Sequence, residues 1–329
     1  MHTSRWLVAV SVVVSSIVAL GAMNTPADAA TSSFSAPVYP GDFPDPAIIV
    51  AGGRYWAYAT GSAGRNLQVM SSPDLRTWTP VSDPLPALPA WASPGRTWAP
   101  GVIQRGSQYV MYYTTHDAAL NHQCISVATS PTPGGPFLDV SSGPLICQAA
   151  NGGSIDPNPY LDPVSGTLVL LWKSDDNSLG SGHPTHLWGQ PLRSDGLAVA
   201  LNTSPSLLLT MSAAWQSPTL EGPTIIRAGG HYVLFYSANN YDSSSSGVGY
   251  ATAPSPLGKY TDQSIFGPWL GTRGNAKGAQ GPWVFTDTTG ATRLAFAAWF
   301  GTVGYENGGV RSLWTAFLTF NSRGAPSAR

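Results

Sequence analysis

Three acidic residues, Asp45, Asp156 and Glu221, stand just ahead of short apolar runs, and each has a proline one or two residues later. Acids are scarce here: the 329 residues include 17 aspartates and glutamates, and only two of these are glutamates. The prolines fix the backbone and help to hold the acidic side chains still. Asp-Pro alone is a common turn signal, but three acids at equivalent places indicate a site.

Carboxyl groups used in pairs are the chemistry of glycosidic bond cleavage. One carboxyl, protonated, gives its proton to the leaving oxygen, while the other, ionised, activates water or attacks the sugar carbon. A third acid nearby keeps the donor protonated by like-charge repulsion. The longer Glu221 suits the proton donor, Asp45 suits the base and Asp156 suits the modulator, although the set of three is firmer than the assignment within it.

A carbohydrate site also needs flat apolar faces for sugar C–H groups and polar groups for the hydroxyls. Phe43 lies two residues before the first acid, and Trp98 directly precedes the opening of a second apolar run. Arg311 is one of few basic residues on an expected strand over 310–320. It would bind sugar hydroxyls or pair with Glu221, and a plain surface role fits the spacing equally well.

Repeated strands must position these residues. A turn followed by a strand rich in Tyr, Val, Leu and Trp recurs five times at intervals of 54 to 64 residues, and long amphipathic helix patterns are missing. About four short strands per unit and five units predict an all-β fold, a five-bladed β-propeller. A pair of β-sandwiches or a β-helix is the alternative, but this period is too long for a β-helix coil.

Each unit opens with a proline-containing segment ahead of its tyrosine-rich strand. Aligned by eye, the openings begin with Asp45, Ala99, Asp156, Glu221 and Gln280. In a propeller the first strands surround the channel, so these five residues would ring one mouth of it. We therefore expect the three acids to meet there, with Gln280 beside them as a substrate contact.

The N-terminal segment and the overall composition predict an exported protein. A positive start, an apolar run and the small residues Ala27-Asp28-Ala29 predict a secretory signal peptide over 1–29, which leaves 30–329 as a single catalytic domain. Charged residues are only 10% and the formal net charge is −1, so nothing indicates nucleic acid, and no later run is long enough to span a membrane. We expect a monomer acting on a neutral polysaccharide, with Cys124 and Cys147 joined in a disulfide.

The chain resembles glycoside hydrolase family 43 from Val38 to Phe320. The matching pieces are Phe43-Pro-Asp45-Pro-Ala, Thr97-Trp98-Ala-Pro, Ser154-Ile-Asp156-Pro-Asn-Pro, Leu171-Trp-Lys-Ser-Asp175 and Leu220-Glu221-Gly-Pro-Thr. The resemblance implies a five-bladed propeller and an inverting enzyme with Asp45 as general base, Asp156 as modulator and Glu221 as general acid. It also implies α-L-arabinofuranosidase, arabinanase or β-xylosidase activity on plant cell-wall polymers, with the arabinofuranose branch favoured.

Two positions depart from that family. Many members have a histidine in the fifth opening that reaches a calcium ion or its waters, and this chain has Gln280 there. We therefore expect no metal or cofactor to be required for catalysis, and Gln280 argues against the structural calcium ion that the family resemblance would allow. Many members also read Trp-Ala-Pro-Asp in the second unit, where this chain has Gly101, so one contact of the family is missing. Arg311 resembles a late substrate-contacting arginine of the family.

Two other classes compete with this reading. A non-catalytic sugar-binding propeller would carry similar sites between its blades, but these five units differ most at their openings. An enzyme that cleaves sucrose or fructan on a related fold would show Asn-Asp-Pro, Arg-Asp-Pro and Glu-Cys. This chain shows Pro-Asp-Pro, Ile-Asp-Pro and Glu-Gly.

We predict that Asp45→Ala and Glu221→Ala each leave a folded protein that has lost most of its activity. Removal of a general acid or base costs ~10² to 10⁴ in rate. Circular dichroism would confirm the fold, and hydrolysis of an oligosaccharide, whose leaving group needs the proton, would measure the loss. Wild-type activity in either variant would show that its assigned role is wrong.

Overall fold

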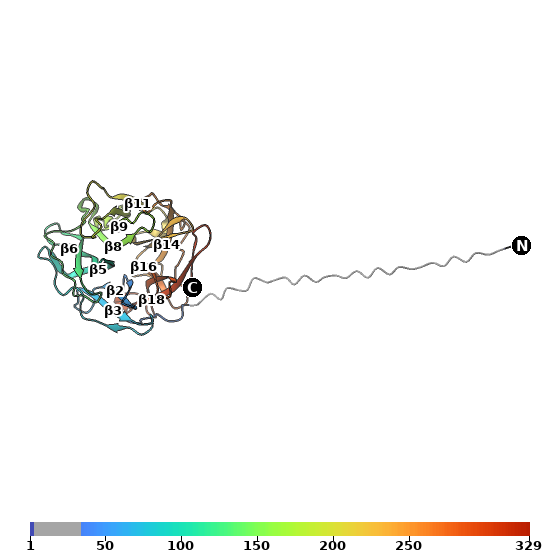
Figure 1. Ribbon diagram of the computed structural model, residues 1–329, viewed down its shortest axis with the longest axis horizontal. Helices are drawn as coiled ribbons and strands as arrows, with labels where there is room; N and C mark the ends of the chain where they lie inside the picture. The colour runs from blue at the N-terminus through green and yellow to red at the C-terminus, as the bar shows by residue number, and fades with distance from the viewer. Residues whose placement is uncertain (3–33) are drawn as a thin grey trace. The chain divides into compact units, whose positions relative to one another are not determined.

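The structure, a computed structural model, describes residues 1–2 and 34–329, so the expected leader and its Ala27–Ala29 signature lie outside the described residues. Within Ser33–Arg329, a unit of its own, the chain folds into five antiparallel sheets around a common centre (Figure 1). The predicted five-bladed β-propeller is confirmed. The first strand of each sheet contacts the first strands of its neighbours, so these five strands form the inner ring.

The blades follow one another along the chain. The first two contain β1 (Ala47–Ala51), β2 (Arg54–Thr60), β3 (Leu67–Ser72), β4 (Thr79–Pro80), β5 (Ala92–Arg105), β6 (Gln108–Asp117) and β7 (His122–Ser130). The third and fourth contain β8 (Ser154–Leu161), β9 (Leu168–Ser174), β10 (His186–Pro191), β11 (Ser206–Thr210), β12 (Leu220–Ala228), β13 (His231–Ala238), β14 (Gly247–Ala253) and β15 (Thr261–Asp262). The fifth contains β16 (Lys277–Thr286), β17 (Thr292–Trp299), β18 (Arg311–Phe320) and β19 (Pro326–Ala328).

Four single 3₁₀ turns complete the described regular structure. They are η1 (Ala149–Asn151), η2 (Asp176–Leu179), η3 (Ala214–Gln216) and η4 (Tyr305–Asn307). Each lies in a connection between strands, and η2 and η4 follow or precede strands that carry cavity residues.

The second strand of each blade is apolar on both faces, because both faces of a blade pack against neighbouring blades. All seven residues of β9 are buried, as are seven of the eight in β13. Apolar clusters fill the spaces between neighbouring blades, and the largest joins blade 1 to blades 2 and 5. A strand buried on both faces is a continuous apolar run, which is why the tyrosine-rich runs were visible in the sequence.

Blade 2 has three strands where four are expected. The segment after β7 makes only isolated bridges to it, between Thr129 and Leu138 and between Ile125 and Ile146. Pro131, Pro133 and Pro136 lie in this stretch, and proline lacks the N–H that a strand ladder needs. The outer edge of this blade therefore ends as an extended loop.

The ring is closed by the start of the described chain. The amide of Val38 donates to the Leu313 carbonyl of β18 at 2.9 Å, and Leu313 donates back to Tyr39 at 3.1 Å. Between blades 5 and 1, the Trp283 indole donates to the Ile48 carbonyl at 2.8 Å. Residues from the two ends of the unit thus share one blade, and this closure sets the place of β18 beside the channel.

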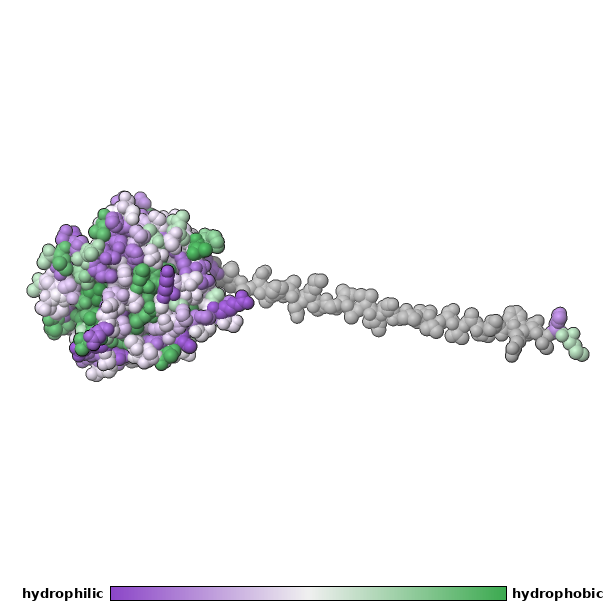
Figure 2. All heavy atoms as spheres, turned by 90° about the horizontal axis from the view of Figure 1, so that it is seen from above, coloured by the Kyte–Doolittle hydropathy of each residue, from purple (hydrophilic) through white to green (hydrophobic). Residues whose placement is uncertain are grey.

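The surface mixes polar and apolar residues, as Figure 2 shows for one face. The large exposed apolar side chains include Phe266, Leu201 and Val140, which come from different blades. In the described part of the chain, no helix has the length and hydropathy needed to cross a bilayer.

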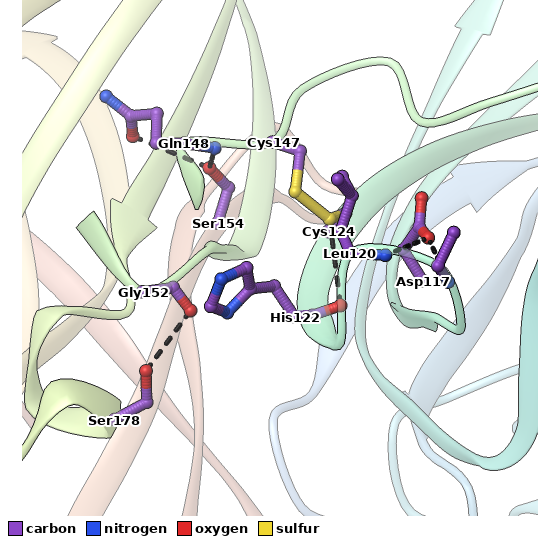
Figure 3. Close-up of a disulfide and its surroundings, with 10 residues drawn as sticks. Asp117, Leu120, His122, Cys124, Cys147, Gln148, Gly152, Ser154 and Ser178 are labelled. Atoms are coloured by element: carbon purple, nitrogen blue, oxygen red, sulfur yellow. Dashed lines mark hydrogen bonds between the residues drawn. A yellow bond between two sulfur atoms is a disulfide. The ribbon is translucent and has the colours of Figure 1, made fainter. Parts of the chain in front are cut away.

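The expected disulfide is present. Cys124, in β7, bonds to Cys147 in the segment that leads to η1 and β8 (Figure 3). The bridge spans 23 residues and ties the approach of β8 to the edge of blade 2. Gln148, the next residue, donates its amide to Ser154 Oγ at 3.0 Å, which continues the same anchoring to the start of β8.

We predict that replacing both cysteines by serine lowers the free energy of unfolding by about 3 kcal/mol, since a cross-link of this loop length restricts the unfolded chain by that amount. Denaturant unfolding would measure the loss, and the wild-type protein with reductant would serve as a second comparison. Activity at low temperature should persist. Equal stability of the variant and the oxidised protein would contradict the prediction.

Candidate active site

In each blade, a residue in the left-handed backbone region stands directly before a proline, within the inner strand or, in blade 1, just ahead of it. These five opening residues, with φ between 44° and 60°, are Asp45, Ala99, Asp156, Gly222 and Gly281. The alignment made from the sequence was therefore one residue off in blades 4 and 5, because the proline marks the position and the acid does not. Glu221 and Gln280 lie one residue ahead of the openings, level with Trp98 in blade 2.

Three openings are held by hydroxyl groups of the preceding blade. Their amides donate from Ala99 to Thr60 Oγ1 at 2.9 Å, from Asp156 to Thr114 Oγ1 at 3.1 Å and from Gly281 to Ser237 Oγ at 2.7 Å. The three hydroxyl residues occupy one equivalent position at the end of the second strand, which we call the clamp position. These hydrogen bonds link neighbouring blades at the channel mouth and so fix the openings relative to one another.

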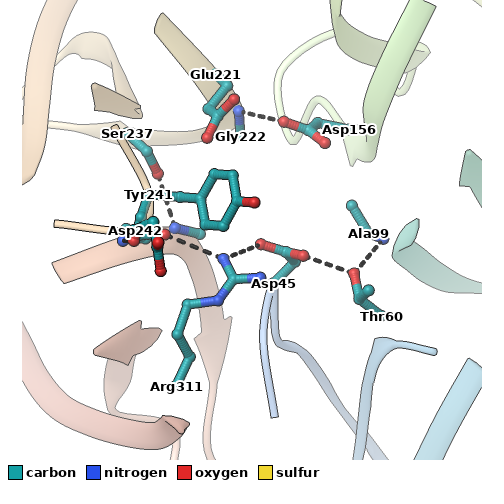
Figure 4. A network of polar contacts seen from close by, with 12 residues as sticks. Asp45, Thr60, Ala99, Asp156, Glu221, Gly222, Ser237, Tyr241, Asp242 and Arg311 are labelled. Carbon is teal, nitrogen blue, oxygen red and sulfur yellow. Dashed lines mark hydrogen bonds and ion pairs between the residues drawn. The ribbon is translucent and has the colours of Figure 1, made fainter. Parts of the chain in front are cut away.

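A cavity of about 560 Å³ opens above this ring, a volume typical of small-molecule sites. All three predicted carboxylates line it, together with Trp98, Lys173, Tyr241, Tyr305 and Arg311. Figure 4 shows Asp45 and Arg311 on one side of a common space, with Asp156 and Glu221 on the other. The structure thus brings together residues from all five blades.

Asp45 is held through both carboxylate oxygens. Thr60 Oγ1 donates to Oδ2 at 2.5 Å, and Arg311 Nη1 lies 3.4 Å from Oδ1. These two donors fix the direction of the carboxylate. A carboxylate has about four lone-pair sites, so Asp45 can still accept a proton from a water molecule in the cavity.

Arg311 is the centre of a second group of contacts. Nη1 donates to Gln280 Oε1 at 3.1 Å, Nε donates to Tyr305 Oη at 3.0 Å, and the backbone amide donates to Asp42 Oδ1 at 3.0 Å. Burial alone would lower the pKa of Arg311, but Asp45 and Tyr305 raise it, so the guanidinium is a permanent cation. The sequence left Glu221 as its possible partner, and the structure pairs it with Asp45.

Asp156 and Glu221 form the other side of the cavity. Asp156 Oδ2 accepts from the Gly222 amide at 2.9 Å, so this acid holds the backbone next to Glu221. Burial, and then the neighbouring Glu221 carboxylate, raise the pKa of Asp156 well above its ordinary value. Asp156 therefore keeps its proton to a higher pH than an isolated aspartic acid would.

Lys173 was missed as a site residue. Its ammonium is 1% exposed and lies 3.2 Å from Asp175 Oδ1 and 3.5 Å from Glu221 Oε2. Burial would lower the pKa of Lys173, but the carboxylates of Glu221, Asp175 and Asp156 outweigh this and raise it. The available signal was the Trp-Lys-Ser-Asp stretch at the third clamp position.

Two tyrosines at the cavity mouth were also missed. The Arg311 guanidinium lies 5.1 Å from the centre of the Tyr241 ring and 5.5 Å from the centre of the Tyr305 ring. The Tyr241 carbonyl accepts from Gln280 Nε2 at 2.6 Å and from the Trp299 indole at 3.0 Å, which ties its serine-rich loop to blade 5. These half-exposed rings offer flat faces beside the carboxylates.

The aromatic residues predicted from the sequence separate. Trp98 lines the cavity, as expected. Phe43 is fully buried and packs edge-on against Tyr39 in the core. The structure therefore does not support Phe43 as a substrate contact, because its ring has no face toward the cavity; nearness in sequence to Asp45 did not indicate the direction of the side chain.

Gln280 does not line the cavity either. It is 2% exposed, and both ends of its amide are engaged, by Arg311 and by the Tyr241 carbonyl. An oxygen that accepts from a guanidinium does not fit the role of a cation ligand. Among the described residues no group of three or more His, Cys, Asp and Glu side chains is arranged to hold a metal. Gln280 is thus a support of Arg311.

Gly101 is explained by packing. A Cβ on this residue would lie 2.5 Å from the Pro157 carbonyl oxygen and 2.7 Å from the Pro159 ring. Blade 3 therefore occupies the space that a side chain would need. In this chain the position contributes to the contact between blades 2 and 3.

Comparison with known proteins agrees with this geometry. The model of the family described as "Glycosyl hydrolases family 43" matches residues 34–296. A β-D-galactofuranosidase of Aspergillus niger is 30% identical over 68% of this chain, and the chain covers 65% of that relative's length. A probable arabinan endo-1,5-α-L-arabinosidase A of Aspergillus oryzae is 26% identical over 86% of this chain and 89% of the relative.

Solved structures show the same fold. A thermostable family-43 glycoside hydrolase superposes with a TM-score of 0.77 at 26% identity, over 88% of this chain and 93% of that one. An endo-1,4-β-xylanase of Bacteroides thetaiotaomicron gives a TM-score of 0.73 at 25% identity, over 90% and 96% of the two chains.

We predict that Asp156→Asn becomes more stable relative to the wild type as pH rises. A carboxyl group with a raised pKa contributes stability below its unfolded value, and this contribution is lost as pH rises through the folded value. The neutral amide has no such loss. Thermal unfolding from about pH 4 to about pH 8 should show the melting difference move in favour of the variant by on the order of 2–4 °C.

Asp287 provides the matched control. Burial alone would raise its pKa, but hydrogen bonds from Thr289 and Arg293 hold the pKa of this carboxyl below its ordinary value. The stability that this carboxylate contributes is present above its unfolded pKa and is lost only below about pH 4, so Asp287→Asn should show a nearly constant deficit against the wild type from about pH 4 to about pH 8. Parallel curves for the two variants would contradict our account of Asp156.

Proposed function

This chain belongs to the glycosyl hydrolases family 43, and from that membership and the cavity we propose that it is an inverting glycosidase that cleaves α-L-arabinofuranosyl linkages. One observation carries the proposal. Asp45, a carboxylate held by two donors, faces across one cavity the pair of Asp156 and Glu221, in which burial and the second carboxylate raise the pKa of Asp156. Environments that favour opposite protonation states assign the acid and base roles.

The mechanism uses this chain's own side chains. Glu221 donates its proton to the glycosidic oxygen as the C1–O bond breaks, so the leaving group departs as a neutral alcohol. Asp45 takes a proton from a water molecule whose oxygen bonds to C1 from the opposite face, and the anomeric configuration inverts. Asp156 holds the backbone at Gly222, next to the acid, and is the modulator of the pair. Arg311 and Thr60 orient the base.

The substrate class rests on the sequence motifs and on the named relatives. One relative is a β-D-galactofuranosidase and several are arabinan endo-1,5-α-L-arabinosidases. The furanose rings of α-L-arabinose and β-D-galactose share their ring configuration and differ in the exocyclic arm. A five-membered sugar is therefore the substrate common to both kinds of relative. Trp98 and Tyr241 supply flat faces for it, and the polymer is a neutral plant cell-wall arabinan or arabinoxylan.

Two alternatives have support of their own. A β-xylosidase of the same family is suggested by the xylanase among the structural neighbours. A non-catalytic sugar-binding propeller would need only the cavity and its aromatic rings. The single differentiated site favours an enzyme, because each of its charged residues has a different partner.

The setting of the enzyme is part of the proposal. We propose that the leader over 1–29 directs export and that a single catalytic domain over 30–329 acts outside the cell as a monomer. The apolar run of the leader and the disulfide support export, and a relative from Bacillus subtilis is an extracellular arabinanase. Gln280 supports catalysis that requires no bound metal.

We predict release of p-nitrophenol from p-nitrophenyl α-L-arabinofuranoside at a rate at least about ten-fold above that from the β-D-xyloside, because a misfitting sugar loses transition-state contacts. The β-D-galactofuranoside and debranched arabinan complete the panel. Proton NMR of the first product should show the β anomer of arabinofuranose.

Preferred cleavage of the xyloside would establish the xylosidase alternative. A folded protein that binds arabinan and hydrolyses none of the four substrates would establish the binding propeller. Retention of the α anomer would show that Asp45 attacks C1 directly.

A further inference from the structure

The clamp position has a different residue in two of the five blades. The pairing registers place Thr114 opposite Trp98, Ser237 opposite Glu221, Lys173 opposite Ile155 and Ala297 opposite Gln280. Hydroxyl residues at this position hold the next opening. Lys173 and Ala297 are the exceptions, and they precede the two blades that carry Glu221 and Asp45. The repeat is thus broken at the two places next to the catalytic acids.

At the third clamp position an ammonium replaces the hydroxyl. A hydroxyl there would accept a hydrogen bond from the Gly222 amide. That amide instead donates to Asp156 Oδ2 at 2.9 Å. Lys173 is therefore not needed as a clamp. Its Nζ points to Glu221 Oε2 at 3.5 Å and is held from behind by Asp175 Oδ1 at 3.2 Å.

We propose that Lys173 is a positioning residue for proton transfer, which fixes Glu221 and stabilises its carboxylate as the proton passes to the leaving oxygen. This proposal rests on the proposed function, in which Glu221 is the general acid. It goes beyond that function by giving a buried cation a part in the donor half of the reaction.

The charge balance explains how a cation helps an acid. The Lys173 ammonium lies 3.5 Å from Glu221 Oε2 and is therefore in place before the reaction begins. As the C1–O bond breaks, negative charge develops on Glu221, and an ammonium already in place stabilises it without reorganisation. The three carboxylates of Glu221, Asp175 and Asp156 are the charged groups that face Lys173.

A purely structural role would not need this residue. A lysine whose side chain is only 1% exposed is costly unless its charge is paired. The equivalent positions of blades 1, 2 and 4 show that threonine or serine satisfies the fold. A role as a sugar contact is also disfavoured, because two carboxylates already engage the ammonium. The remaining use of the charge is toward Glu221.

The test compares Lys173→Met with Lys173→Thr, which installs the residue found at the same position in blades 1 and 2 and so keeps the fold should methionine disturb it. Rates are measured on an aryl arabinofuranoside with a good leaving group, 2,4-dinitrophenol, and on an arabino-oligosaccharide with a poor one. Both variants should lose about ten-fold or more on the oligosaccharide and much less on the dinitrophenyl substrate, because only the poor leaving group needs the proton. The basic limb of the pH profile should move up by about one pH unit, since a nearby cation is lost.

Equal losses on the two substrates with an unmoved basic limb would overturn the proposal in favour of a structural role. A raised KM with unchanged kcat would overturn it in favour of a sugar contact. Lys173→Arg, which keeps the charge, should recover part of the rate on the oligosaccharide if it folds.

Glu221→Gln separates this proposal from the proposed function. If Glu221→Gln cleaves the oligosaccharide as well as the wild type, the general acid itself is wrong and the proposal fails with it. If Glu221→Gln loses the oligosaccharide and keeps the dinitrophenyl substrate, while the Lys173 variants behave as wild type, only the role of Lys173 is refuted.

Discussion

The left-handed backbone of the five opening residues is the constraint on which the site depends. For residues with a side chain this conformation costs roughly 1–2 kcal/mol each, and Asp45, Ala99 and Asp156 adopt it. Such conformations persist only where the surroundings hold them, and here the prolines and the amide bonds to the preceding blade do so. The turn that results aims the side chains of the openings into the channel mouth, where the strands would otherwise direct them between blades.

Within this ring, charge is arranged in two halves. Asp45 faces a guanidinium and a hydroxyl, whereas Glu221 faces a carboxyl group and an ammonium. Water screens little of the attraction in either half, because Arg311 and Lys173 are both buried. In the proposed mechanism, the same fold thus supplies an acid and a base from similar side chains by giving them different neighbours. Lys173 occupies a clamp position that lacks a hydroxyl and supplies the ammonium next to Glu221, while β8 and β9 remain paired.

The repeats in the sequence predicted the propeller because each second strand is buried on both faces and so stands out as an apolar run. The three acids were predictable because prolines mark their turns. The exact level of Glu221 was not, since its opening residue is the following glycine. Lys173 and Tyr241 were missed because their partners lie in other blades or on a loop, and Phe43 was wrongly assigned because position beside an acid does not determine whether a ring faces the cavity or the core.

The closure of the ring has a consequence for synthesis. Asp45 and its partner Arg311 are 266 residues apart in the chain, and Val38 pairs with Leu313 of the last blade. Because the first residues of the unit pair with the last blade, Asp45 acquires its cationic partner only when nearly the whole polypeptide has emerged. A truncated or still-growing chain would carry all three acids and yet have an unassembled site, so activity appears late and all at once.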